Sequence, residues 1–193
     1  MSDVLGQALA RSARAPEGLD RRRFLCGSLA LLVAPAALAR AAELEQALET
    51  SGFVYISPLR ADGSESTCHG EVWFGWIDGA VVINTSKETW KARALERGLD
   101  RARIWVGDHG RWKQLVGSSQ AFRQAPSFEA RAERKKDDAL LDRLLSIYEK
   151  KYPGEIAKWR DRMRSGYADG SRILVRYTAS PQTGRRRTLE STG

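Results

Sequence analysis

Two hydroxyl-bearing and three cationic side chains follow one another closely near the middle of the chain. They are Thr85, Ser86, Lys87, Lys91 and Arg93. Cations and hydroxyls near a chain turn are the groups that bind a phosphate. At helical spacing, Lys87 and Lys91 lie one turn apart on the same face. The pattern predicts a site for a phosphorylated small molecule, although a solvated helix face would carry the same residue types.

Cys68 and His69 form a second pair of reactive side chains. Two soft ligands side by side can bind a metal or haem. Cys26 lies in an amino-terminal segment that we expect to be removed, and the other His is His109 in a turn, so too few ligands are left for a zinc site. We therefore predict no metal, and the pair is either an ordinary strand edge or, as an alternative, a haem ligand through His69.

Runs of apolar and β-branched residues predict the strands that must position these groups. Asp78-Gly79 between two such runs indicates a tight hairpin. The expected strands cover 53–59, 71–77, 80–85, 103–107, 112–122 and 172–177.

Apolar faces at helical spacing predict four helices. The expected ranges are 43–51, 86–97 (ended by Gly98), and a pair on either side of Pro153-Gly154. The first of that pair turns its leucines and Tyr148 inward, and the second turns Ile156, Trp159 and Met163 inward. Residues 131–136 are expected to be a charged connection. This order predicts a small antiparallel barrel with peripheral helices.

The order of motifs resembles the pyridoxamine 5′-phosphate oxidase-like split-barrel family over residues 44–179. The matching segments are Phe53 to Ile56, Asp62-Gly63, Glu71-Val72-Trp73-Phe74, Asp78-Gly79, Val81 to Thr85 and Lys91-Ala92-Arg93-Ala94-Leu95. The resemblance implies a mainly β (α+β) fold, a six-stranded antiparallel split barrel of Greek-key type with peripheral helices. It also implies an FMN or deazaflavin cofactor and a homodimer that shares the cofactor cleft.

The resemblance assigns expected roles to individual residues. Lys91 matches the family's phosphate-binding lysine, and Arg93 follows at the expected offset. Thr85, Ser86 and Lys87 would complete the phosphate site, and Trp73 is the candidate wall for the cofactor ring. We name no catalytic residue, because the bound ring would do most of the chemistry.

The chain departs from the family pattern at Ala94, where asparagine is usual. This departure motivates an alternative, a non-catalytic split-barrel binding protein that is free of cofactor or binds haem.

The amino-terminal segment has the features of a twin-arginine secretory signal. Arg21 and Arg22 precede an apolar run, residues 25–39, that is short for a membrane span and contains Pro35. Small residues predict cleavage near 39–42, although an uncleaved, partly buried helix is the alternative. We expect a signal over 1–42, a split-barrel domain over 43–179 and a disordered basic tail over 180–193.

Charge and cysteine content fit an exported protein that folds in the cytosol. The whole chain has a net charge of +8, and residues 43–193 contain 26 basic and 21 acidic residues, a net charge of +5. This mild excess predicts no nucleic-acid partner. Cys68 alone follows the signal, so no intramolecular disulfide is expected. The sequence thus predicts a periplasmic flavin- or deazaflavin-dependent oxidoreductase for a small molecule, exported by the twin-arginine translocase, without a stable membrane span.

Overall fold

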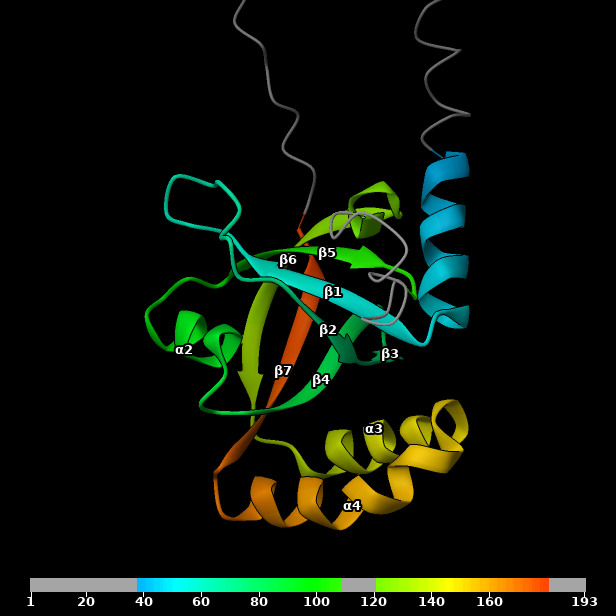
Figure 1. Ribbon diagram of the computed structural model, residues 1–193, viewed down its shortest axis with the longest axis vertical. Helices are drawn as coiled ribbons and strands as arrows, with labels where there is room; N and C mark the ends of the chain where they lie inside the picture. The colour runs from blue at the N-terminus through cyan, green and yellow to red at the C-terminus, as the bar shows by residue number, and fades with distance from the viewer. Residues whose placement is uncertain (1–37, 109–120, 181–193) are drawn as a thin grey trace, which may run out of the picture. The chain divides into compact units, whose positions relative to one another are not determined.

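The computed structural model describes residues 38–108 and 121–180, and one antiparallel sheet dominates them (Figure 1). The sheet has seven strands in the order β2-β1-β5-β6-β7-β4-β3. Their bounds are β1 (Phe53–Pro58), β2 (Gly70–Trp73), β3 (Gly75–Ile77), β4 (Ala80–Ser86), β5 (Arg101–Val106), β6 (Ser127–Lys135) and β7 (Arg172–Ala179).

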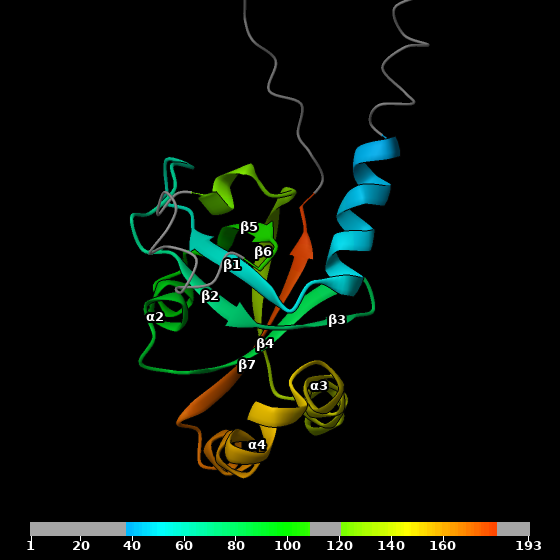
Figure 2. The ribbon, with the colours of Figure 1, turned by 45° about the vertical axis from the view of Figure 1, so that its right-hand side comes forward.

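The two edge strands of the sheet, β2 and β3, are consecutive in the chain and are separated only by Phe74. Because one residue joins the two edges, the sheet must curl until they meet, and the result is a split barrel (Figure 2). The predicted mainly β fold, an antiparallel barrel with peripheral helices, is confirmed. The barrel has seven strands rather than the expected six.

Two strand predictions were wrong. The expected strand over 71–77 is two strands, because β2 pairs with β1 whereas β3 pairs with β4. The expected charged connection over 131–136 is mostly part of β6, whose Phe128, Ala130 and Ala132 are buried. Charged residues alternate with these three on the opposite face and obscured the strand pattern. The expected strand over 112–122 lies outside the described residues except for its last two positions.

Helices surround the sheet close to the predicted places. They are a helix over 38–50, α2 (Trp90–Glu96), the short 3₁₀ helix η2 (Ala121–Gln124), α3 (Asp138–Lys151) and α4 (Pro153–Ala168). Helix α3 buries the predicted apolar face, whereas Trp159 on α4 is 38% exposed and not inward-facing as expected. Apart from 38–42 and Ser180, the predicted signal and tail lie outside the described residues. None of the helices in the described part is long and apolar enough to span a membrane.

The two larger apolar clusters of the described residues pack against the two sides of the sheet, and a smaller one joins Tyr55 and Trp105 to Phe122 of η2. The barrel interior contains side chains from β1, β4, β5, β6 and β7, together with Leu48 of the 38–50 helix and Ala92 of α2. The second cluster lies between the sheet and the α3–α4 pair, and Figure 2 shows these two helices packed below β4 and β7. The two clusters follow from the alternation of side chains along each strand.

The corner at Phe74 is held by hydrogen bonds from the end of α3. The Tyr148 hydroxyl donates to the Trp73 carbonyl (2.9 Å), and the Phe74 amide donates to the Tyr152 hydroxyl (3.4 Å). Tyr152 in turn donates to the carbonyl of Gly52, just before β1. Burial raises the pKa of Tyr152 to about 12, so its hydroxyl stays protonated at neutral pH. The helix thus satisfies backbone groups that the change of strand partner would leave unpaired.

Replacing Tyr152 tests how much this corner contributes to stability. Tyr152→Phe removes both hydrogen bonds and leaves backbone groups at Gly52 and Phe74 without these partners, so we expect unfolding to become about 1–3 kcal/mol easier. Tyr177→Phe is the matched control, because this buried hydroxyl makes no hydrogen bond within the described residues. Urea denaturation of both variants measures the difference. Equal midpoints for the two variants would contradict a role for the corner.

Candidate functional site

The turn from β4 to α2 carries the residues with predicted phosphate-binding roles. Ser86 is still in the strand, where it pairs with Arg172 of β7. The Thr89 amide and hydroxyl both donate to the Ser86 carbonyl (3.1 and 2.9 Å), and α2 begins at Trp90. The helix therefore starts four residues later than predicted. Lys87 lies in the turn and not on the helix, so the predicted shared helical face of Lys87 and Lys91 was wrong.

Lys91 is a buried cation without a counter-ion. Its side chain belongs to the face of α2 that also buries Ala92, and the residue is only 8% exposed. No acidic group pairs with it in the part of the chain that the structure describes. Its ammonium lies 4.8 Å from the centre of the Trp90 ring, and burial lowers the pKa of Lys91 to about 8. A buried ammonium in this state would be stabilised by an anion.

Three hydroxyl-bearing residues, Thr85, Ser86 and Thr89, precede Lys91 in the sequence. Thr85 is 6% exposed, on the same side of β4 as the barrel-interior residues Val81 and Ile83. Its hydroxyl is 3.2 Å from that of Thr89. The Ser86 hydroxyl accepts a hydrogen bond from the Glu88 amide (3.2 Å). These groups are able to contribute hydrogen bonds to a bound phosphate.

The other two predicted cations are exposed. Lys87 faces solvent, and the Arg93 guanidinium pairs with Glu88 at 2.6 Å, with both side chains more than half exposed. The hydrogen bond from Arg93, together with its positive charge, also lowers the pKa of Glu88. Exposed ion pairs of this kind contribute little to stability, and Arg93 can exchange Glu88 for another anion at small cost.

Trp73 is placed apart from the phosphate-type residues. Its ring stacks on Tyr152, with centres 4.3 Å apart and planes within 9°. It packs with the cluster beneath α3 and α4, whereas Thr85 follows the barrel-interior face of β4. Within one chain, the structure does not bring Trp73 together with Lys91.

Cys68 and His69 lie just before β2, and their side chains differ in exposure. Cys68 is exposed and has a free thiol. The His69 ring lies 4.8 Å from that of Phe122, and its Nδ1 is buried without a hydrogen-bond partner in the described residues. Within residues 38–108 and 121–180, no three His, Cys, Asp or Glu side chains gather where a metal could bind.

Thr89 and Arg97 are two residues near this site that the sequence analysis missed. Thr89 closes the turn, because its hydroxyl donates to the Ser86 carbonyl. Arg97 lies four positions after Arg93, a helical spacing that would have suggested a shared face. The place of Thr89 in the turn follows only once α2 is known to begin at Trp90.

Comparisons with known proteins find similar folds at low identity. No family model and no curated protein matches the chain. Similar solved structures include a conserved hypothetical protein of Mycobacterium tuberculosis (22% identity, 72% of this chain and 80% of that one, TM-score 0.48). Another is the haem storage protein HutZ of Vibrio cholerae (17% identity, 72% of this chain and 89% of that one, TM-score 0.49). A third is a candidate pyridoxamine 5′-phosphate oxidase of Listeria innocua (13% identity, 70% of this chain and 90% of that one, TM-score 0.44). At these values the similarity concerns the course of the chain and not its chemistry.

Removing the buried charge of Lys91 is expected to stabilise the free protein. Because the folded-state pKa is about 8, below the 10.5 of an exposed lysine, the unfolded chain binds more protons between these values, and stability rises with pH across that window. Below pH 8 the burial cost is fully present. Lys91→Met should therefore be about 1–3 kcal/mol more stable than the parent at pH 7, with a smaller gap at pH 10.

Urea denaturation of both proteins at the two pH values measures this gap. The comparison between them cancels the titration of Lys151, whose pKa burial also lowers to about 8. A Lys91→Met protein less stable than the parent at pH 7 would contradict the unpaired-charge interpretation.

Proposed function

We propose that the protein is a flavin- or deazaflavin-dependent oxidoreductase that binds the cofactor phosphate at the β4–α2 turn. The observation that carries the proposal is the buried Lys91 ammonium, which lacks an acidic partner in the described residues. Natural proteins keep such costly groups mainly where a function requires them. A phosphate would supply the missing counter-charge.

The residues present fit a phosphate-bearing cofactor. Lys91 would provide the buried charge, Thr85 and Ser86 would provide hydroxyls, and Arg93 would add a cation from the surface. The ring of the half-buried Trp90 lies beside the Lys91 ammonium and would help to keep water from a phosphate bound there. When bound, a flavin or deazaflavin ring supplies hydride transfer to or from a small molecule. The protein's part is to bind and orient that ring.

Export and dimerisation belong to the same proposal. The twin-arginine route would carry a protein that has already folded around a cytosolic cofactor. The family resemblance in the sequence implies a homodimer, and a small molecule as substrate. The alternative, a split-barrel protein that binds haem or no cofactor, keeps Ala94 and His69 as its motivation.

The decisive experiment is a titration of cofactor-free protein with FMN and, separately, with a deazaflavin coenzyme. Lys91→Ala should weaken binding of the preferred cofactor by about 10–100-fold, because it removes a charge-assisted contact. Lys91→Arg should retain most of the affinity, and Lys87→Ala, an exposed cation beside the same turn, should change it less than about 3-fold. Fluorescence quenching of the ring reports binding.

The same titration can also contradict the cofactor proposal. If neither cofactor binds, or if binding ignores Lys91→Ala, the proposal is wrong. A Soret band on haem titration that disappears in His69→Ala would then support the alternative.

The affinity for the cofactor should also depend on pH. Lys91 loses its proton as pH rises through about 8, so the parent protein should bind the phosphate more weakly at pH 9.5 than at pH 7. Lys91→Arg stays charged over this range and should show a flatter profile. Parallel titrations at the two pH values test this, and identical profiles would rule out Lys91 as the titrating group.

The export proposal predicts the location of the protein in cells. Arg21→Lys combined with Arg22→Lys should leave the protein in the cytosol, because the twin-arginine pair is the recognised feature. Cell fractionation followed by immunoblotting measures the distribution. Unchanged export of the double variant would contradict this route.

A further inference from the structure

A pocket of about 300 Å³ opens between α2 and the segment that follows β1. Its lining includes three arginines, Arg60, Arg93 and Arg97, together with Trp90 and Cys68. None of the described residues that line it is acidic. Of these five, only Arg93 belongs to the phosphate-type set, and Lys91 is not part of the lining.

The three guanidinium groups leave the pocket positively charged. Arg97 has no ion-pair partner in the described part of the chain. Arg60 interacts with Asp62, and Arg93 with Glu88, but neither acid is in the lining. Several cations around a concave surface raise the local concentration of anions.

Apart from Ser66, the remaining lining residues of the pocket are apolar. Trp90 contributes an aromatic side chain, and Pro58, Leu59, Ala94 and Leu99 contribute aliphatic ones. A volume of this size is at the lower end of small-molecule sites. Charge on one part and apolar surface on another favour a small organic acid, a carboxylate joined to a flat apolar group.

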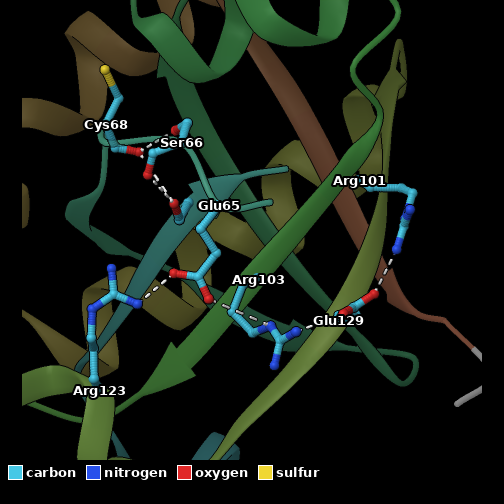
Figure 3. Close-up of polar contacts among 8 residues, drawn as sticks. Glu65, Ser66, Cys68, Arg101, Arg103, Arg123 and Glu129 are labelled. Carbon is cyan, nitrogen blue, oxygen red and sulfur yellow. Dashed lines mark hydrogen bonds and ion pairs between the residues drawn. The ribbon is translucent and has the colours of Figure 1, made fainter. Parts of the chain in front are cut away.

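A chain of ion pairs and hydrogen bonds holds the Cys68 side of the pocket in place. The Ser57 hydroxyl donates to the Ser66 carbonyl (3.1 Å) and, more weakly, toward that of Cys68 (3.4 Å). Glu65 pairs with Arg123 and with Arg103, which tie the segment to η2 and β5. In Figure 3 the Cys68 thiol points away from these ion pairs, which leaves it free to face the pocket that it lines.

The α2 side is fixed as well. Ala92 is buried in the barrel interior, and Leu95 packs against the same cluster, so the helix cannot roll freely. Arg93 therefore projects from a fixed helix, and Arg97 follows directly after the end of that helix. This degree of preorganisation favours binding over mere attraction of counter-ions.

We propose that this pocket binds a small aromatic carboxylate, at a site separate from the phosphate site at Lys91. The carboxylate would pair with Arg97 and Arg60, and its ring would lie against Trp90. The proposal does not rest on a flavin cofactor, because neither Arg97 nor Arg60 has a role in holding the phosphate.

The Cys68 thiol provides the test, through its reaction with disulfide reagents. The thiolate sulfur attacks one sulfur of dithiobis-nitrobenzoate, an aromatic dicarboxylate, to form a mixed disulfide and release coloured thionitrobenzoate, while the thiol proton goes to solvent. Dipyridyl disulfide reacts in the same way but is neutral. The assay uses the full chain with Cys26→Ser, so that Cys68 is the one thiol, and Cys68→Ser as the blank.

A carboxylate-binding pocket predicts a preference for the anionic reagent. Relative to a free cysteine peptide, Cys68 should favour dithiobis-nitrobenzoate over dipyridyl disulfide by about 10-fold or more at low salt, and less at high salt. Arg97→Gln should remove most of this preference. Arg164→Gln is the control, because this arginine lies on α4 and pairs with Asp142. Benzoate should protect Cys68 from both reagents in the parent protein and less in Trp90→Leu.

Three results would overturn the proposal. The first is a reagent preference of Cys68 no greater than that of the free cysteine peptide, and the second is a preference that Arg97→Gln leaves unchanged. The third is that FMN protects Cys68 as well as benzoate does and that this protection by FMN is lost in Lys91→Ala. The last would mean that the pocket and the cofactor site are one. Loss of FMN binding in Lys91→Ala, with the reagent preference intact, would instead show that the two sites are separate.

Discussion

The single-residue corner at Phe74 is the constraint on which the barrel depends. It joins the two edge strands of the sheet, so neither edge can stay open or pair with another strand there. The change of partner from β1 to β4 interrupts the ladder of backbone hydrogen bonds, and Tyr148 and Tyr152 replace what is lost. The ammonium of Lys151 also lies 3.9 Å from the centre of the buried Phe74 ring. The barrel and the α3–α4 pair are therefore coupled through one residue.

Helices α3 and α4 mainly stabilise the fold, whereas α2 carries a buried charge that has no acidic partner in the described residues. Helices α3 and α4 cover one cluster with leucines and tyrosines, and several of their exposed charges form ion pairs, as in Arg143 with Asp78. Helix α2 instead buries Lys91 without a counter-ion in the described residues and presents Arg93 and Arg97 toward a pocket. One short helix thus combines a buried cation that lacks an acidic partner in the described residues with arginines at a pocket.

The local sequence pattern predicted the structure correctly wherever one residue type dominated a segment. Asp78 and Gly79 both have positive φ values, as a two-residue hairpin requires, and the leucine face of α3 is buried as expected. Prediction was wrong where opposing signals overlapped. The alternating charges of β6 resembled a loop, and the continuous apolar run through Phe74 concealed a change of strand partner. Neither can be recognised without knowing which strands pair.

The residue types of the candidate site, and the hairpin and helices around it, follow from sequence alone, because they depend on neighbours a few positions apart. The burial of Lys91 and the exposure of Lys87 do not, since they depend on where β4 ends and on which face of α2 meets the barrel. The grouping of Arg60 and Cys68 with Arg97 depends on packing between segments that are remote in the chain. Burial, pKa and the shape of a pocket are properties of that packing, and residue identity cannot supply them.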